Sequence, residues 1–401
     1  MKKIRYTSIE GNSTKFLGLL AVYGLFLLLG FYAFVTMEHE GHWITGMTNQ
    51  VMWGLPHVFA IFLIVAASGA LNVASIASAF NKSFYKPLAK LSAVLAVALL
   101  AGGLIVLLLD LGRADRLIIA ITHYNFKSIF AWNIILYSGF FGIVGIYLWT
   151  MLDWQVEKYK RIAGTAAFIW RLILTTGTGS IFGFLVSRQG YDEAILAPMF
   201  VIMSFSYGLA IYILVLMATY KWTGRPLGDA VIKRLKDLLG VFVAATIYFA
   251  AVYHLTNLYI TEHHGFEAYI LRDGGLMTNL FWWGQIILGS LVPLALVYCP
   301  RPAKSRAMTV LASILVIAGG FSALYVIVIG GQSYPMTLVP GYQASSTFSD
   351  GIIANYDPSK WELMLGLGGV AIAMLIVTFG LKLFRLVPES LADELTDPHQ
   401  S

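Results

Sequence analysis

The chain has 401 residues, of which 58% are hydrophobic and 12% are charged. Soluble domains are typically about 45–50% apolar and about 25% charged, so this composition excludes a soluble domain and indicates an integral membrane protein. The net charge of +6 does not suggest a nucleic-acid partner, and the single cysteine, Cys299, excludes both a disulfide framework and a cysteine-ligated iron–sulfur cluster held by this chain alone.

Ten apolar segments follow one another along the chain. A membrane span needs about 20 predominantly apolar residues, and ten segments meet this condition: 16–36, 51–80, 88–110, 128–152, 162–186, 194–220, 238–260, 276–298, 308–330 and 361–385. They predict an all-α, polytopic membrane protein with about ten transmembrane helices in one membrane domain, residues 1–401. We expect two four-helix bundles, for which segments two to five and six to nine are candidates, plus two extra C-terminal helices.

Lysine and arginine are unevenly distributed between the two sides of the predicted membrane. Of 27 such residues, 20 fall at the termini and in the loops that follow even-numbered segments, and six fall on the opposite side. Cytoplasmic loops are enriched in these residues, so we expect a multi-pass protein of the cell inner (cytoplasmic) membrane with both termini in the cytoplasm. Residues 331–360 are then a long non-cytoplasmic loop, and residues 386–401 a short, little-ordered cytoplasmic tail.

The densest polar stretch, DLGRADRLIIAITHYNFKSIFAW, lies between the third and fourth segments. At the predicted outer surface it carries three candidates for chemistry: Asp110, Arg113 and His123. Trp53 and His57 lie at the same depth, because the second segment begins there. A buried ionisable group inside a membrane is costly and is therefore a functional candidate, which applies to His57 above all.

These groups also have purely structural interpretations. Trp53 fits an interfacial aromatic belt, and Arg113 can simply pair with Asp110 or Asp115. Four histidines of the outer loops are expected to be solvated: His39, His42, His263 and His264.

A second candidate is Arg171, which lies well inside the fifth segment. An arginine this deep in a membrane must pair or meet water. Together with Thr175 and Ser180 it suggests a proton or water path to the cytoplasm. The alternative is helix–helix hydrogen bonding by small hydroxyl residues.

The intramembrane histidines could serve a haem or a quinone. A haem would need facing ligands, for which His57 and His254 are the candidates. A quinone fits better, because its carbonyls accept hydrogen bonds and because quinol oxidation needs a proton acceptor such as a histidine or an aspartate. No metal site is expected.

Four motifs occur in order along the first part of the chain: WGLPHVFAIFLIVAASGA, YKPLAKL, DLGRADRL and HYNFKSIFAWN. Through about residue 155 this sequence resembles the NrfD/polysulphide reductase membrane-anchor family. Its length is similar to that of a ten-helix branch, found in membrane subunits of certain nickel–iron hydrogenases and of sulphite-reductase-linked transmembrane complexes. In that branch the last two helices and the loop 331–360 would be an addition.

The resemblance implies a quinone-reactive subunit, using menaquinone or ubiquinone as substrate, with no haem or iron–sulfur cluster of its own. The quinone site would lie in about residues 51–152, with His57 and Asp110 in the catalytic roles. The quinone-binding residues carried over by position are Trp53, His57, Asp110, Arg113 and His123. The family pocket also has an Asn and a Tyr, for which Asn72 and Tyr253 are candidates.

The resemblance also implies partners. A ferredoxin-like iron–sulfur subunit would dock on the non-cytoplasmic face, with further redox subunits such as a multihaem cytochrome c or a molybdopterin or sulfur enzyme. The chain would then exchange electrons between the quinone pool and that partner. Two alternatives remain open: a secondary transporter of ions or small sulfur solutes, which usually has a midplane site, and a haem-bearing cytochrome b-type anchor.

Overall fold

The computed structural model describes residues 4–299, 305–336 and 351–396, which are largely helical. Among these residues, nine helices are long and apolar enough to cross a membrane: Thr14–Glu40 (α1), Leu55–Ser78 (α2 and α3), Ser83–Leu109 (ending in α4), Ile129–Leu152 (α6), Leu196–Thr223 (α8), Asp229–Tyr259 (α9), Leu276–Tyr298 (α11 to α12), Arg306–Ser333 (α13 to α14) and Lys360–Leu383 (α15). The predicted all-α membrane fold is confirmed.

Several of these spans are divided into parts by an interruption or by a change of helix type. The parts are α2 (Leu55–Ala70), α3 (Asn72–Ser78), α4 (Ala89–Leu109), α11 (Leu276–Asn279), the π-helix η7 (Leu280–Leu291), α12 (Val292–Tyr298), α13 (Arg306–Tyr325), the π-helix η9 (Val326–Gly330) and α14 (Gly331–Ser333). Short helices outside the spans are α5 (Leu117–Thr122), α10 (His264–Ala268) and α16 (Asp393–Thr396).

The remaining predicted span, 162–186, corresponds to α7 (Lys160–Gly183). At about 1.5 Å per residue its 24 residues are about 36 Å long, enough to cross a bilayer. It is less apolar than the others, because it carries Lys160, Arg161 and Arg171 as well as several Thr, Ser and Gly residues. It packs between α6 and α8, which shields its polar face.

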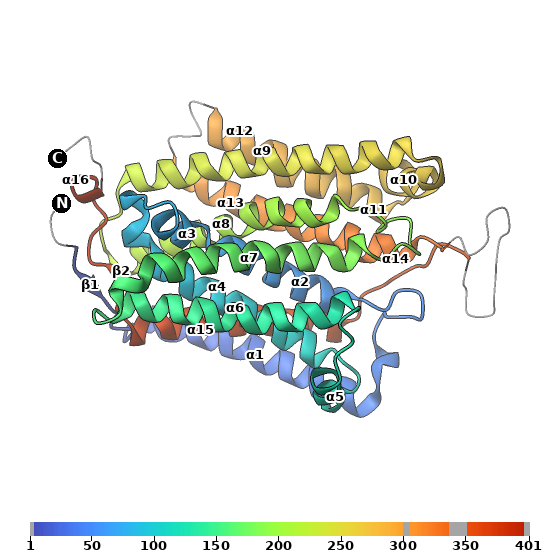
Figure 1. Ribbon diagram of the computed structural model, residues 1–401, viewed down its shortest axis with the longest axis horizontal. Helices are drawn as coiled ribbons and strands as arrows, with labels where there is room; N and C mark the ends of the chain where they lie inside the picture. The colour runs from blue at the N-terminus through green and yellow to red at the C-terminus, as the bar shows by residue number, and fades with distance from the viewer. Residues whose placement is uncertain (1–3, 300–304, 337–350, 397–401) are drawn as a thin grey trace.

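The spans run side by side along the long axis of the molecule (Figure 1). Helices α2, α4, α6 and α7 pack into one bundle, and α8, α9, the α11–α12 span and α13 pack into a second. The two helices outside these bundles are α1 and α15, which pack on each other, with α15 also against α4 and α2. The extra pair therefore consists of the first and last helices, and the prediction of two C-terminal additions is wrong in this respect.

The two bundles meet where α2 crosses α8. A Cβ atom added at Gly69 would collide with the carbonyl of Ser204, and one at Gly208 would collide with the backbone of Ala70. The two helix backbones are thus in direct contact, which only glycine permits at these positions.

Both chain ends lie at the same end of the molecule, here named the terminal end (Figure 1). There β1 (Tyr6–Thr7) pairs antiparallel with β2 (Val387–Pro388), and Leu386, Val387 and Leu391 are buried. The prediction of a little-ordered tail is therefore wrong for residues 386–396, while 397–401 lie outside the described residues. The opposite end, which holds the start of α2 and the end of α4, is named the site end.

Candidate functional site

The core of the site is a carboxylate–imidazole pair at the site end. His57 lies in the first turn of α2, and Asp110 ends α4, so two antiparallel helices bring them to one level. His57 Nδ1 lies 2.7 Å from Asp110 Oδ2, and the Asp110 side chain is fully buried while that of His57 is 14% exposed. The ring is not oriented for a straight hydrogen bond to either carboxylate oxygen. The pair nevertheless holds Nδ1 toward the carboxylate, which leaves Nε2 as the ring nitrogen that can meet a ligand.

A second histidine approaches the same carboxylate. His42 lies in the short 3-10 helix η1 (His42–Ile44), and its Nε2 lies 3.1 Å from the Asp110 carbonyl oxygen and 4.0 Å from Oδ1. The expectation that His42 is simply solvated is wrong. Asp110 is therefore flanked by two imidazoles.

Trp53 lies beside His57 within a cluster of aromatic rings. The Trp53 ring stacks near His57 with centroids 6.3 Å apart, and it also stacks on Tyr191 at 6.3 Å. Phe130 and Phe182 meet the Trp53 ring edge-on at 6.0 and 5.7 Å. Trp53, just before α2, thus belongs to an aromatic wall with Phe130 of α6, Phe182 of α7 and Tyr191 of the loop after α7, which extends its predicted role beyond a membrane-surface belt.

The backbone before α2 is held by one buried amide, Gln332 of α14. Its Oε1 accepts hydrogen bonds from the backbone N–H groups of Met52 (3.0 Å) and Trp53 (2.9 Å), and its Nε2 donates to the carbonyls of Trp53 (3.0 Å) and Val328 (2.8 Å). Arg188 donates to the carbonyl oxygens of Gln332 and Gln50. These groups position Trp53, and the sequence pattern contained no signal for them.

A buried carboxylate fixes the same segment from the other side. Glu362, fully buried at the start of α15, accepts hydrogen bonds from the N–H groups of Gly46 (2.8 Å) and Ser359 (2.7 Å) and from the Tyr356 hydroxyl (2.5 Å). Tyr356 in turn accepts from the Leu55 N–H at 2.6 Å. The described end of the predicted loop 331–360 therefore supports the site, whereas residues 337–350 lie outside the described part of the chain.

Two predicted site residues lie apart from the pair. Arg113 is exposed and makes a bidentate contact with Asp115, with both N···O distances 3.0 Å. Of the two pairings considered for Arg113, the structure has the one with Asp115 and not the one with Asp110. His123 follows α5 and is exposed, with its Nδ1 3.0 Å from the Thr122 hydroxyl. Whether Arg113 and His123 meet a ligand stays a prediction.

Arg171 lies in the middle of the first bundle and joins α7 to a break in α2. Its Nη1 donates to Asn72 Oδ1 (2.6 Å) and to the Ser68 carbonyl (3.1 Å), where the helix is interrupted at Leu71. The guanidinium also lies between two rings, 4.9 Å from Phe205 and 5.2 Å from Phe168. Asn72 is thus engaged at this break rather than beside His57.

The hydroxyl residues near Arg171 have local partners as well. Thr175 donates to the Arg171 carbonyl of its own helix at 2.8 Å. Ser180 is buried one and a half turns further on. The Thr175 contact stays within α7, so it does not join two helices. The helix–helix alternative and a proton path through these residues both stay predictions.

A second buried imidazole–carboxylate pair occupies the other bundle. His254 Nδ1 lies 2.9 Å from Glu267, which is fully buried. Glu193, in the loop before α8, is also buried, and burial together with the negative charges of Glu267 and Asp192 raises the pKa of Glu193 to about 7. Tyr253 donates to the Gly190 carbonyl at 2.8 Å in the same region.

The two candidate haem ligands therefore belong to different bundles, and each faces a carboxylate. His57 pairs with Asp110 in the first bundle, and His254 pairs with Glu267 in the second. Among the described residues no group of three or more His, Cys, Asp or Glu side chains could hold a metal ion. The absence of haem and clusters from this chain stays a prediction.

The chain matches one family model and several known proteins in sequence. The family model "Polysulphide reductase, NrfD" matches residues 43–335, well beyond the segment to about residue 155 that carries the motifs. The chain is 30% identical to the Hdr-like menaquinol oxidoreductase integral membrane subunit of Archaeoglobus fulgidus over 397 residues, which covers 98% of this chain and 99% of that protein.

Two other relatives are more distant. A selenate reductase subunit of Mesobacillus selenatarsenatis is 22% identical over 94% of this chain and 93% of its own length. A polysulfide reductase polypeptide of Wolinella succinogenes is 24% identical over 71% of this chain and 96% of its own length. Because the family model covers most of the chain and the first relative spans nearly all of it, this protein belongs to the polysulphide reductase, NrfD family.

Proposed function

We propose that this chain is the quinone-reactive membrane subunit of a respiratory oxidoreductase complex. The observation that carries the proposal is the fully buried Asp110 carboxylate held against His57 beside an aromatic wall at one end of the membrane bundle. The Archaeoglobus relative is a menaquinol oxidoreductase subunit by name, which supports the same chemistry.

In quinol oxidation each departing hydroxyl proton needs an acceptor. His57 supplies one at Nε2, since its Nδ1 is held toward Asp110. When the ring becomes charged, the buried carboxylate stabilises it, as an aspartate does for a histidine base in other enzymes. Trp53 provides a flat apolar surface for the quinone ring. In the reverse direction the same pair returns the proton to the substrate.

An apolar groove offers a place for the isoprenoid tail. The groove has a volume of about 170 Å³ and lies between α1, α4 and α15. Val106 and Leu109 line it, and Leu109 directly precedes Asp110. A lipid-soluble substrate could therefore approach the end of α4 from the bilayer.

The electrons must leave through a partner, because the proposed site supplies acid–base groups only. We propose that a ferredoxin-like iron–sulfur subunit docks over the site end, where Arg113 and His123 are exposed. Further redox subunits would receive or supply the electrons. In this arrangement the site end faces away from the cytoplasm and both termini lie in the cytoplasm, at the inner membrane.

Proton exchange with the cytoplasm is a separate part of the proposal. Arg171, Thr175 and Ser180 lie between the site and the terminal end and would order water along α7. Exchanging Thr175 for Val should then lower proton uptake from the cytoplasmic side in proteoliposomes while quinol binding persists. Unchanged proton uptake would remove these residues from the proposal.

The site itself is tested by titrating the purified protein with a fluorescent quinol analogue and following the quenching of its emission. Wild type should quench saturably, and His57→Gln and Asp110→Asn should weaken binding or abolish it. His39→Gln is the matched control, because this imidazole is 85% exposed and, among the described residues, pairs only with its neighbour Glu40.

Binding must also be followed on the co-purified complex, since a partner can complete a pocket. Saturable quenching that survives in both site variants would contradict the assignment to this pair. If neither the isolated protein nor the complex binds the analogue, the transporter alternative gains ground, and solute uptake into proteoliposomes would establish it. A reduced-minus-oxidised spectrum of the purified protein tests the haem alternative directly.

A further inference from the structure

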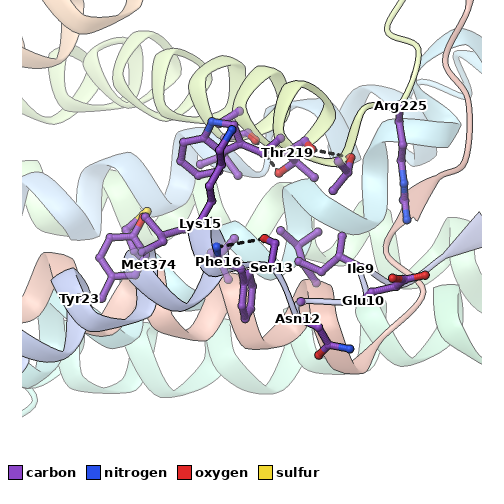
Figure 2. A pocket seen from close by; sticks show the side chains of 18 of the residues that line it. Ile9, Glu10, Asn12, Ser13, Lys15, Phe16, Tyr23, Thr219, Arg225 and Met374 are labelled. Carbon is purple, nitrogen blue, oxygen red and sulfur yellow. Dashed lines mark hydrogen bonds between the residues drawn. The ribbon is translucent and has the colours of Figure 1, made fainter.

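A cavity of about 670 Å³ opens at the terminal end, at the opposite end of the bundle from His57. It is lined by the segment before α1, the first turns of α1, the last turns of α8 and the second half of α15 (Figure 2). Helices α1 and α8 do not pack closely against each other, and α15 forms the floor between them. The cavity is therefore open along the face of the bundle that would meet lipid.

The residues that line the cavity change from apolar in its deeper part to polar at its mouth, along the membrane normal. The deeper part is apolar, with Tyr23, Leu214 and Met374 among the lining residues. The mouth is polar and lies where α1 begins and α8 ends. Trp222, 63% exposed, lies at this mouth and has the amphipathic ring that proteins place at the level of lipid headgroups.

The mouth carries more positive than negative charge. Lys15 extends from α1 toward the end of α8, and Arg225 lies across the opening from it (Figure 2). Glu10 is the acidic side chain of the lining, and Lys382, 5.6 Å from the Phe16 ring, adds another cation at the edge. The N-terminus of the 27-residue helix α1 contributes further positive potential.

The Arg225 guanidinium has an N–H donor group for which the described part of the chain offers no hydrogen-bond partner. One terminal nitrogen, Nη2, donates to the Ser8 carbonyl at 2.7 Å, but the buried Nη1 has no hydrogen-bond partner among the described residues. A buried donor without an acceptor is costly. The guanidinium therefore keeps donor capacity that its contact with Ser8 does not use.

We propose that this cavity is a binding site for one anionic phospholipid of the surrounding leaflet. An acyl tail fills the apolar part between α1, α8 and α15, and the phosphate lies between Lys15 and Arg225. Basic pockets between transmembrane helices recognise acidic headgroups in this way. The bound lipid joins α1 to the second bundle, which α1 does not otherwise contact closely. This inference is independent of the redox proposal.

The test measures thermal unfolding of the delipidated protein in neutral detergent as lipid is added. Phosphatidylglycerol should raise the Tm saturably, while phosphatidylcholine and inorganic phosphate should not. Lys15→Gln should weaken the apparent affinity for phosphatidylglycerol about fivefold, the usual effect of one basic residue on an anionic headgroup. Lys233→Gln, an exposed cation of the same end that does not line the cavity, should behave like wild type.

A steric variant separates the lipid tail from its headgroup. Ala218→Trp should fill the apolar part and abolish the Tm response while both cations remain. Equal responses to the two phospholipids, or a Lys15→Gln response equal to wild type, would overturn the proposal. A full response to inorganic phosphate alone would assign the site to a free anion and would overturn it as well.

Discussion

Gln332 offers the sharpest test of how the site is held. Exchanging it for Met keeps the length of the side chain and removes all four hydrogen bonds of the amide. At about 0.5–1.5 kcal/mol for each bond, the loss totals about 2–6 kcal/mol. Three of the bonds join the backbone of Met52 and Trp53, so most of this loss falls on the segment that presents Trp53 and His57.

The expected result is faster hydrogen exchange at residues 52 and 53, a lower Tm, and weaker binding of the quinol analogue. If about 1.4 kcal/mol of the lost free energy falls on the conformation that binds the analogue, the affinity for the analogue drops about tenfold. Gln50→Met is the graded control, since its amide donates only two hydrogen bonds, to Ser333 (3.2 Å) and Ile352 (3.1 Å). Wild-type exchange and Tm in Gln332→Met would refute the reasoning that this amide positions the segment.

Three further predictions follow from the same structure. Asp110→Asn should lower quinol-coupled turnover of the co-purified complex about 10–100-fold, because the histidine loses the carboxylate that orients it; full turnover would argue against the pair. Glu193 has a pKa raised to about 7, so the folded state binds more protons than the unfolded state between pH 4.5 and 7 and loses stability as pH rises through this window. Glu193→Gln should therefore raise the Tm relative to wild type at pH 8 and leave it nearly unchanged at pH 5, and a pH-independent difference would contradict the assignment. Gly208→Leu should destabilise by about 3 kcal/mol or prevent assembly, because its side chain would strike the backbone of Ala70, whereas Gly142→Leu, with open space around it, should be tolerated.

The spans and the central pair of the site could be predicted from the sequence because both depend on local patterns. Apolar segments of sufficient length define the helices, and successive spans alternate in direction, so the start of one and the end of the next share a membrane surface. The sequence thus predicts His57 and Asp110 at one depth, and in the structure His57 Nδ1 lies 2.7 Å from Asp110 Oδ2. The sequence does not show which aspartate pairs with Arg113. In the structure Arg113 pairs with the exposed Asp115, two residues away, and not with the buried Asp110.

The supporting residues could not be predicted because their contacts join distant parts of the chain. Gln332 reaches Met52 and Trp53 across about 280 residues of sequence, and Glu362 reaches Gly46 across 316. Hydrophobic periodicity carries no information on such pairs. Likewise, His42 looked like an ordinary loop histidine until the fold placed it beside Asp110.

The pairing of α1 with α15 has a consequence for how the protein is made. Synthesis delivers α1 to the bilayer first and α15 last, so α1 stays without its main helical neighbour until the final span is inserted. The same late event brings Glu362 to Gly46 and β2 to β1. Insertion of the last helix thus completes the fold. A polypeptide truncated before this helix would have an unpartnered first helix and a site open on one side, and both features would expose it to membrane quality control.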